Sequence, residues 1–419
     1  MSNLMNIRAE VASWIDSNWD PELSLRTWRE KLVEGGWAMP SWPEAYFGRG
    51  FTAEQSAAVA EVFNDKGVLG VAQAGPGRLA SHTILTHGTE AQKQKYLKPI
   101  LTGEHAWCQL FSEPGSGSDL AGLTTKAEKV GDAWRVNGQK VWNTSAHHAD
   151  FGILLARTNW DVPKHQGISY FLIDMRQPGV EVRPLKQMNG HASFNEVFMV
   201  DATVAPDDLL GQEGEGWSIA ATTLSLERQA FAIDRSGGPM RNRQGPIFDE
   251  YRAELAIALE PYTWYPQREG RVDLAFPHAQ KTGAIENPVV RQELARLIGL
   301  RRGAQLAAAR AAEERRTGTQ RVIPEGSIGK LAASVIARQA AHVHTLCAGT
   351  DALFTGSDAV EEGIIAELLL SVPAISIAGG TDEIQKNIIA ERVLGLPKEP
   401  RFDKGPFRDV PRNASELLD

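Results

Sequence analysis

Helical periodicity dominates the first hundred residues. Apolar side chains recur at the spacing of one helix face, for example at Val11, Trp14, Ile15 and Trp19. A stretch rich in glycine and proline, 35–50, interrupts this pattern. Thr52 and Thr89 each precede a new periodic run, where a threonine hydroxyl acts as an N-cap. The pattern predicts an N-terminal helical domain over residues 1–105.

After residue 104 the spacing between apolar residues falls towards two, which is typical of strands. Short runs rich in β-branched and aromatic residues are separated by Gly, Asn, Asp and Pro. The predicted strands are 133–136, 152–157, 168–173, 180–182 and 196–200. We therefore expect a middle β domain over residues 106–213.

Helical spacing returns at Gly216, and the predicted helices are 216–231, 287–316, 327–347, 359–369 and 381–395. Residues 235–286 contain few long periodic runs, and we expect an elaborated connection with short helical pieces there. The C-terminal helical domain is placed at 214–419. The order helix, strand, helix predicts an α+β fold with helical domains at both ends.

Composition narrows the class of protein. A chain of 419 residues is too long for one ordinary core, so two or three packed units are expected. No apolar run reaches the roughly 20 residues of a membrane span. A net charge of −8 argues against general nucleic-acid binding. Cys108 and Cys347 do not suggest a disulfide framework and the N-terminus lacks the apolar core of a signal peptide, so a cytoplasmic location is expected.

Metal-ligand spacing is not evident among the Cys and His residues. His147 and His148 form an adjacent pair, but neighbouring residues do not share a helix face or one side of a strand. The sequence therefore predicts no metal site.

Two motifs contain side chains that could bind a ligand. Residues 109–119 form a turn-rich loop with the hydroxyl donors Ser112 and Ser118, suited to a phosphate or an electron-rich heterocycle. Residues 138–145 place Trp142, which can stack on a flat ring, beside Thr144. Each motif alone has an ordinary explanation, as a turn and as a core tryptophan.

Together with three further motifs, these segments resemble the acyl-CoA dehydrogenase family over nearly the whole chain. The matching stretches, in order, are 87–97, 112–119, 140–144, 196–198 with 211–217, and 380–385. The resemblance is to the branch whose catalytic base lies on the helix after the β domain, including actinobacterial relatives. It implies an N-terminal helical domain, a middle β domain and a C-terminal helical bundle. It also implies FAD between the last two domains, touched by a neighbouring subunit of a dimer or tetramer.

The reaction implied by the resemblance is α,β-dehydrogenation of an acyl-CoA to the trans-2-enoyl-CoA, as in β-oxidation of fatty acids or other lipids. A base removes the α-proton, hydride passes to flavin N5, and an electron-transferring flavoprotein is the expected acceptor. The residues implied to bind FAD are Phe111, Ser112, Gly117, Ser118, Trp142, Thr144, Thr381 and Glu383. Those implied to bind substrate are Ser118, Arg228 and Gly380.

The catalytic base is the main departure from the common family pattern. Many members carry it at the position of Gly379, and a glycine cannot accept a proton. In the branch named above the base directly precedes an arginine, and Glu227 before Arg228 matches that position. A largely apolar helix face formed by Thr223, Leu224 and Phe231 would raise the pKa of this carboxyl towards neutrality. The alternative is an exposed glutamate in an ion pair.

Gly379 and Arg228 then take other roles. The Gly379 N–H is expected to remain as a donor to the thioester oxygen, and Arg228 to brace the helix.

In the family, a partner subunit completes half of the FAD site. Two sequence features of that half are degraded in this chain. The arginine that reaches the FAD pyrophosphate of the adjacent subunit is missing, with Arg241, Arg243 and Arg268 as loose candidates. The glycine-containing motif at 346–350 is altered as well. Two alternatives therefore stay open: a non-catalytic or half-site subunit of a hetero-oligomer, and a flavin oxidase or monooxygenase on the same fold. The retained 380–385 signature argues against the last.

Overall fold

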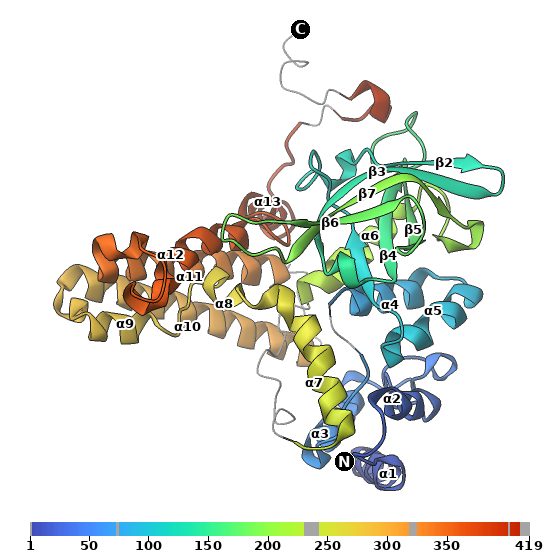
Figure 1. Ribbon diagram of the computed structural model, residues 1–419, viewed down its shortest axis with the longest axis horizontal. Helices are drawn as coiled ribbons and strands as arrows, with labels where there is room; N and C mark the ends of the chain where they lie inside the picture. The colour runs from blue at the N-terminus through green and yellow to red at the C-terminus, as the bar shows by residue number, and fades with distance from the viewer. Residues whose placement is uncertain (1, 73–74, 230–242, 318–324, 401–402, 411–419) are drawn as a thin grey trace.

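Helices at both ends of the chain flank a central sheet. The structure, a computed structural model, describes residues 2–72, 75–229, 243–317, 325–400 and 403–410. Figure 1 shows the N-terminal helices below the sheet and a bundle of C-terminal helices extending to one side. The predicted α+β fold class is confirmed. Phe231 and Arg241 lie outside the described residues.

The N-terminal helices are α1 (Ser2–Asn18), α2 (Leu25–Glu34), α3 (Ala53–Lys66), α4 (Gly75–His87) and α5 (Glu90–Thr102). Two of them, α3 and α5, begin directly after the predicted caps Thr52 and Thr89. Thr52 and Thr89 each close a capping box, with Gln55 and Gln92 respectively. Each box satisfies two backbone N–H groups that a helix start would otherwise leave unpaired.

The sheet contains eight strands in the order β6-β7-β3-β2-β4-β5-β8, with β1 parallel to β4. They are β1 (Trp107–Leu110), β2 (Lys126–Val130), β3 (Ala133–Thr144), β4 (Phe151–Arg157), β5 (Ile168–Asp174), β6 (Val180–Leu185), β7 (Phe194–Val204) and β8 (Leu209–Leu210). All five predicted strands are present. β1, β2 and β8 were not predicted, because β1 and β8 are very short and β2 reads Lys-Ala-Glu-Lys-Val, a mostly exposed charged pattern.

Helix α6 (Gly216–Gln229) joins the sheet to the N-terminal helices. Ile219 and Ala220 enter the same apolar core as residues of α1 to α5 and β5. Thr223 is fully buried, and its hydroxyl lies 2.9 Å from that of Thr83 on α4 and 3.1 Å from that of Tyr170 on β5. This contact fixes the helix one turn before Glu227.

Within the predicted elaborated connection, one helix is longer than expected. Helix α7 (Pro246–Leu259) has 14 residues and descends onto the N-terminal helices (Figure 1). Its Glu254 receives two hydrogen bonds, of 2.6 and 2.8 Å, from the buried guanidinium of Arg29, and Glu250 accepts the N–H of Leu25 at 2.7 Å. The following helices, α8 (Tyr265–Arg268) and α9 (Ala275–Lys281), are short, as predicted.

The C-terminal helices are α10 (Pro288–Thr317), α11 (Glu325–Ala348), α12 (Ile364–Ser371) and α13 (Asp382–Arg392). The prediction for the third of these began too early. Residues Val360–Gly363 form a 3-10 turn in which Glu361 and Glu362 have positive φ, so the α-helix begins only at Ile364. α13 begins as predicted at Thr381, whose hydroxyl accepts the N–H of Ile384, but it ends before the predicted residue 395.

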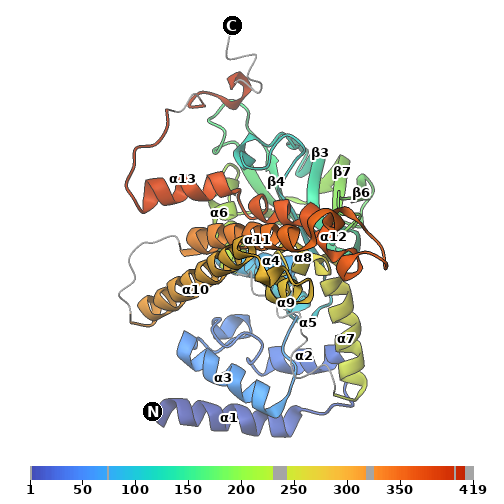
Figure 2. The same cartoon turned by 90° about the vertical axis from the view of Figure 1, so that its left-hand side faces the viewer.

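The chain beyond α13 returns to the sheet (Figures 1 and 2). Phe407 is buried, its ring lies 3.4 Å from the guanidinium carbon of Arg157, and its N–H donates to Val162 O at 2.9 Å. Lys164 lies 2.7 Å from Asp403 of this tail and 2.8 Å from Asp119. Lys164 therefore links the tail to Asp119, at the end of the 109–119 loop, because it pairs with a carboxylate of each.

Replacing Phe407 with Ala is expected to release this tail. Burial of the ring contributes about 2 kcal/mol to docking, so the undocked fraction should rise about 30-fold. Limited proteolysis should then cut within 396–410 correspondingly faster. Phe354→Ala, at a side chain that is 60% exposed, is the matched control. Equal cleavage of wild type and Phe407→Ala would contradict the docking.

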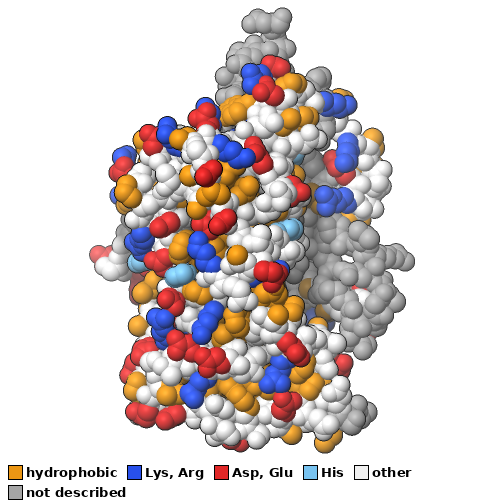
Figure 3. Space-filling model, turned by 90° about the vertical axis from the view of Figure 1, so that its right-hand side faces the viewer, with side chains coloured by type: hydrophobic (Ala, Val, Ile, Leu, Met, Phe, Trp, Pro, Cys, Tyr) orange, Lys and Arg blue, Asp and Glu red, His pale blue; other side chains and the backbone are white. Residues whose placement is uncertain are grey.

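The surface drawn in Figure 3 is mixed in character. Lys and Arg side chains are interspersed with Asp, Glu and hydrophobic side chains, so the described residues on this face show no continuous basic stripe. In the part of the chain that the structure describes, no helix has the length and apolar character needed to cross a membrane.

Candidate active site

The two motifs singled out in the sequence lie side by side. The N–H of Val141 donates to Ser112 O at 2.9 Å. The buried ammonium of Lys140 donates to Phe111 O at 3.0 Å, and Asn143 Nδ2 donates to Gln109 O at 2.7 Å. No pattern in the sequence indicates these long-range bonds, which hold the loop against β3.

A buried carboxylate shapes the loop. Glu113 exchanges two backbone hydrogen bonds of 3.0 Å with Ser116, and its side chain accepts the N–H groups of Thr124 and Thr125 and the ammonium of Lys140. Burial alone would raise the pKa of Glu113, but Lys140 and these donors outweigh it and lower the pKa to about 2.

Beyond this turn, Gly117 and Ser118 are exposed. Their N–H groups donate to no other described residue. The loop therefore presents backbone donors and the Ser118 hydroxyl to solvent, as an anion or heterocycle site requires.

Trp142 has an unusual conformation. The register of β3 against β7 shifts between Lys140 and Asn143, and Trp142 there has a φ of 65°. A left-handed backbone is costly for an aromatic residue, and such strain concentrates at functional sites. Its indole is 55% exposed and lies edge-on to the ring of Phe194, with 5.8 Å between the ring centroids and 81° between the ring planes.

The residues beside Trp142 offer polar groups. Thr144 is half-buried, and Asn143 Oδ1 is buried with no hydrogen-bond partner among the described residues. A flat ring on Trp142 would find a stacking surface and polar groups together.

Glu227 lies in the last turn of α6, beside the strand that opens into the loop. Its carboxylate is half-buried and accepts Gln109 Nε2 at 3.4 Å. Gln109 precedes Phe111 by two residues, so Glu227 lies near the start of the loop. Sequence reasoning did not identify Gln109, because only the paired strands bring it to α6.

The C-terminal signature forms a tight glycine turn. Gly379 and Gly380 have φ of 69° and 86°, and Gln385 Nε2 donates to both carbonyls, at 3.0 and 3.2 Å. The φ of Gly380 is a backbone conformation that residues with a Cβ rarely adopt, so glycine is favoured at this position. Behind the turn, buried Asp382 pairs with Lys330 at 3.0 Å.

No hydrogen bond among the described residues joins this turn to Ser118 or Trp142. Thr381 caps α13 and Glu383 is exposed in its first turn. α13 lies beside the sheet above α10 and α11 (Figure 2), and no hydrogen bond among the described residues joins it to Glu227 or to the loop. The N–H of Gly379 donates to no described residue.

Several predicted residues have other environments than expected. The side chain of Phe111 is buried and packs edge-on against Tyr170 at 5.9 Å, so only its backbone faces the loop. Arg228 belongs to α6, but its side chain is outside the described part. Arg243 donates to Gly67 O at 3.1 Å, and Arg268 is buried over the ring of Tyr265. Both arginines therefore serve packing within this chain.

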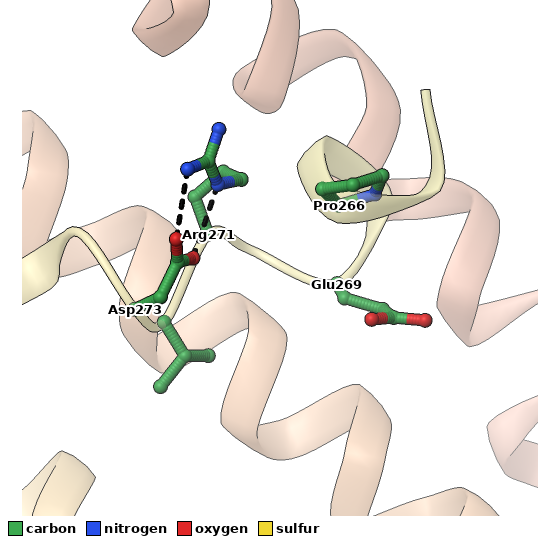
Figure 4. A pocket seen from close by; sticks show the side chains of 5 residues that line it. Pro266, Glu269, Arg271 and Asp273 are labelled. Atoms are coloured by element: carbon green, nitrogen blue, oxygen red, sulfur yellow. Dashed lines mark hydrogen bonds and ion pairs between the residues drawn. The ribbon is translucent and has the colours of Figure 1, made fainter. Parts of the chain in front are cut away.

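An open depression of about 480 Å³ lies elsewhere, between α8 and α9. Figure 4 shows its lining residues Pro266, Glu269, Arg271 and Asp273, with Arg271 paired to Asp273 at 2.8 Å. None of the predicted site residues lines it, so it is separate from the candidate active site.

Comparisons with known proteins agree with this architecture. The sequence matches the N-terminal, middle and C-terminal domains of acyl-CoA dehydrogenases over residues 6–104, 108–201 and 270–394. Acyl-CoA dehydrogenase IpdE1 of Mycobacterium tuberculosis is 31% identical over 409 residues, which cover 89% of this chain and 99% of that protein. The chain belongs to the acyl-CoA dehydrogenase family, a family of flavoprotein oxidoreductases.

Two further relatives match the chain over different lengths. Acyl-CoA dehydrogenase FadE34 of the same organism is 44% identical over 216 residues, which are 50% of this chain but only 29% of FadE34. The ChsE4-ChsE5 complex from Mycobacterium tuberculosis contains a chain that superimposes with a TM-score of 0.63, covering 95% of this chain and 99% of that chain. At 24% identity this likeness concerns the fold.

Proposed function

We propose that this protein catalyses FAD-dependent α,β-dehydrogenation of an acyl-CoA thioester, with Glu227 as the base. The observation that carries the proposal is the contact of the Glu227 carboxylate with Gln109, the first residue of the 109–119 loop. This contact places a proton acceptor beside the loop that carries the exposed donors. Asn143 Nδ2 donates to Gln109 O, so the same residue is also linked to the strained segment around Trp142.

The residues present fit a flavin nucleotide. Backbone and hydroxyl donors at 117–118, an exposed indole and the orphaned Asn143 Oδ1 offer phosphate, stacking and ring-edge contacts. The residues that would hold FAD are Phe111 through its backbone, Ser112, Gly117, Ser118, Trp142, Thr144, Thr381 and Glu383. FAD, when bound, supplies the hydride acceptor of the reaction.

The chain's own residues supply the acid–base and electrostatic parts. Glu227 accepts the α-proton of the thioester, while the buried Thr223 hydroxyl keeps its helix seated. The unused N–H of Gly379 donates to the thioester oxygen as negative charge develops there. Ser118, Arg228 and Gly380 contact the substrate in this proposal, and an electron-transferring flavoprotein receives the electrons.

Anaerobic titration with a panel of acyl-CoA thioesters tests the proposal. The purified protein is expected to be yellow, and at least one thioester should bleach the flavin absorbance and yield the 2-enoyl-CoA. The corresponding 2-enoyl-CoA, whose Cα–Cβ bond is already a double bond, is the control and should leave the flavin oxidised. A yellow protein bleached by no saturated thioester in the panel would contradict the proposed reaction.

A second candidate is a half-site subunit that needs a different partner chain. It is favoured by Arg243 and Arg268, because both are engaged within this chain instead of being available to a neighbour's pyrophosphate. Strongly exposed apolar side chains on the C-terminal part, Leu353, Phe354, Ile377 and Leu394, support association as a homo- or hetero-oligomer. Protein that is colourless alone and binds FAD only with a co-expressed relative would favour this candidate.

A further inference from the structure

We propose that His147, His148 and Glu260 form a binding site for a divalent transition-metal ion of the Zn²⁺ type. One ligand atom from each residue lies within 4.8 Å of the other two. The site is independent of the candidate active site and of the proposed dehydrogenation.

The two histidines converge because of the backbone before them. Ser145 has a left-handed conformation, with a φ of 54°, and the chain then enters a 3-10 turn, Ala146–His148. The two imidazole rings consequently lie with centroids 4.0 Å apart and 47° between their planes. The expectation that adjacent residues cannot share a ligand set holds for regular helices and strands, and this segment is neither.

The third ligand comes from a distant part of the chain. Glu260 begins the 3-10 turn Glu260–Tyr262 at the end of α7. The elaborated segment thereby places a carboxylate beside the turn that follows β3. No spacing rule in the sequence connects these positions, so only the fold reveals the cluster.

The donor set suits zinc-like ions. Two imidazoles and one carboxylate leave a fourth tetrahedral position for water. Tetrahedral coordination with bonds of about 2.0–2.1 Å needs ligand atoms roughly 3.4 Å apart. All three side chains are exposed, so rotamer changes can close the remaining gap without repacking a core.

The neighbouring charges are nearly balanced. Arg176 donates to His148 O at 3.2 Å and opposes a bound cation, but Asp150 lies 3.5 Å from the same guanidinium. Glu260 adds a negative charge among the ligands. A metal ion there would link the end of α7 to the turn three residues after Thr144, and so tie the elaborated segment to the sheet.

Calorimetric titration of the tag-free, chelator-treated full chain with Zn²⁺ tests the site. We expect one saturable Zn²⁺ per chain, with affinity reduced at least 10-fold in His148→Ala and in Glu260→Gln. His342→Ala and Glu286→Gln, at exposed positions outside the cluster, are matched controls and should bind as wild type does. Wild-type affinity in both cluster variants, or no saturable binding, would overturn the proposal.

Hydrogen exchange gives a second readout that does not depend on affinity alone. Zn²⁺ should slow amide exchange in residues 257–262 of the wild-type protein and leave it unchanged in Glu260→Gln. Equal slowing in both proteins would place the ion elsewhere and overturn the proposal.

Discussion

Glu227→Gln is expected to leave a yellow protein whose flavin is no longer bleached by acyl-CoA. The substitution keeps the size and hydrogen-bonding capacity of the side chain but removes the proton acceptor. Loss of a positioned base typically costs 10²- to 10⁴-fold, so the rate constant of anaerobic flavin reduction should fall at least about 100-fold. Stopped-flow absorbance in single turnovers measures this step directly.

The controls separate loss of the base from loss of the site. Glu213→Gln changes an exposed carboxylate that pairs with Lys129 at 3.2 Å, and should reduce flavin at the wild-type rate. Glu227→Asp keeps a carboxylate on a shorter side chain and should be intermediate. Unchanged flavin content in all variants would show that the cofactor site is intact. Flavin reduction by Glu227→Gln at the wild-type rate would refute the assignment of the base.

Local chemistry predicted the threonine-capped helix starts well and the sheet only partly. Threonine caps at 52, 89 and 381 depend on residues three positions away, so the sequence contains the whole interaction. Strand β2 instead depends on its antiparallel pairing with β3, which overrides the low strand propensity of its charged residues. Helix α7 depends on Arg29 and Leu25, which lie far away in sequence.

The same distinction holds for the candidate site. Family resemblance pointed to Glu227, Ser118 and Trp142, and the fold places Glu227 beside Gln109 and the tryptophan segment beside the loop. Gln109 and Lys140 were not identified as supporting residues, because their contacts form only when β1, β3 and α6 assemble. The strain at Trp142 is likewise a property of the β3–β7 register.

Lys140→Met is expected to lower the free energy of unfolding by about 3–5 kcal/mol, because it leaves the Glu113 carboxylate buried without its cation. The ammonium and carboxylate are 2.8 Å apart, and their side chains are 0% and 5% exposed. Urea unfolding measures the change. Lys129→Met, in an exposed pair, is the matched control and should cost less than about 1 kcal/mol. The double variant Lys140→Met/Glu113→Gln should recover part of the loss, because no unpaired charge then remains.

The buried pair of Glu113 and Lys140 also predicts how the stability of the protein changes with pH. In the wild type the pKa of Glu113 is lowered from 4.5 to about 2, so the unfolded state binds more protons between these values. The stabilisation is complete above pH 4.5 and is lost as pH falls towards 2. Without Lys140 the charge and the hydrogen bond that lower the pKa of Glu113 are lost, so this pKa lies above its wild-type value and acidification should reduce the deficit of Lys140→Met relative to wild type. A deficit that stays constant between pH 7 and pH 3 would show that the buried charge is not the cause.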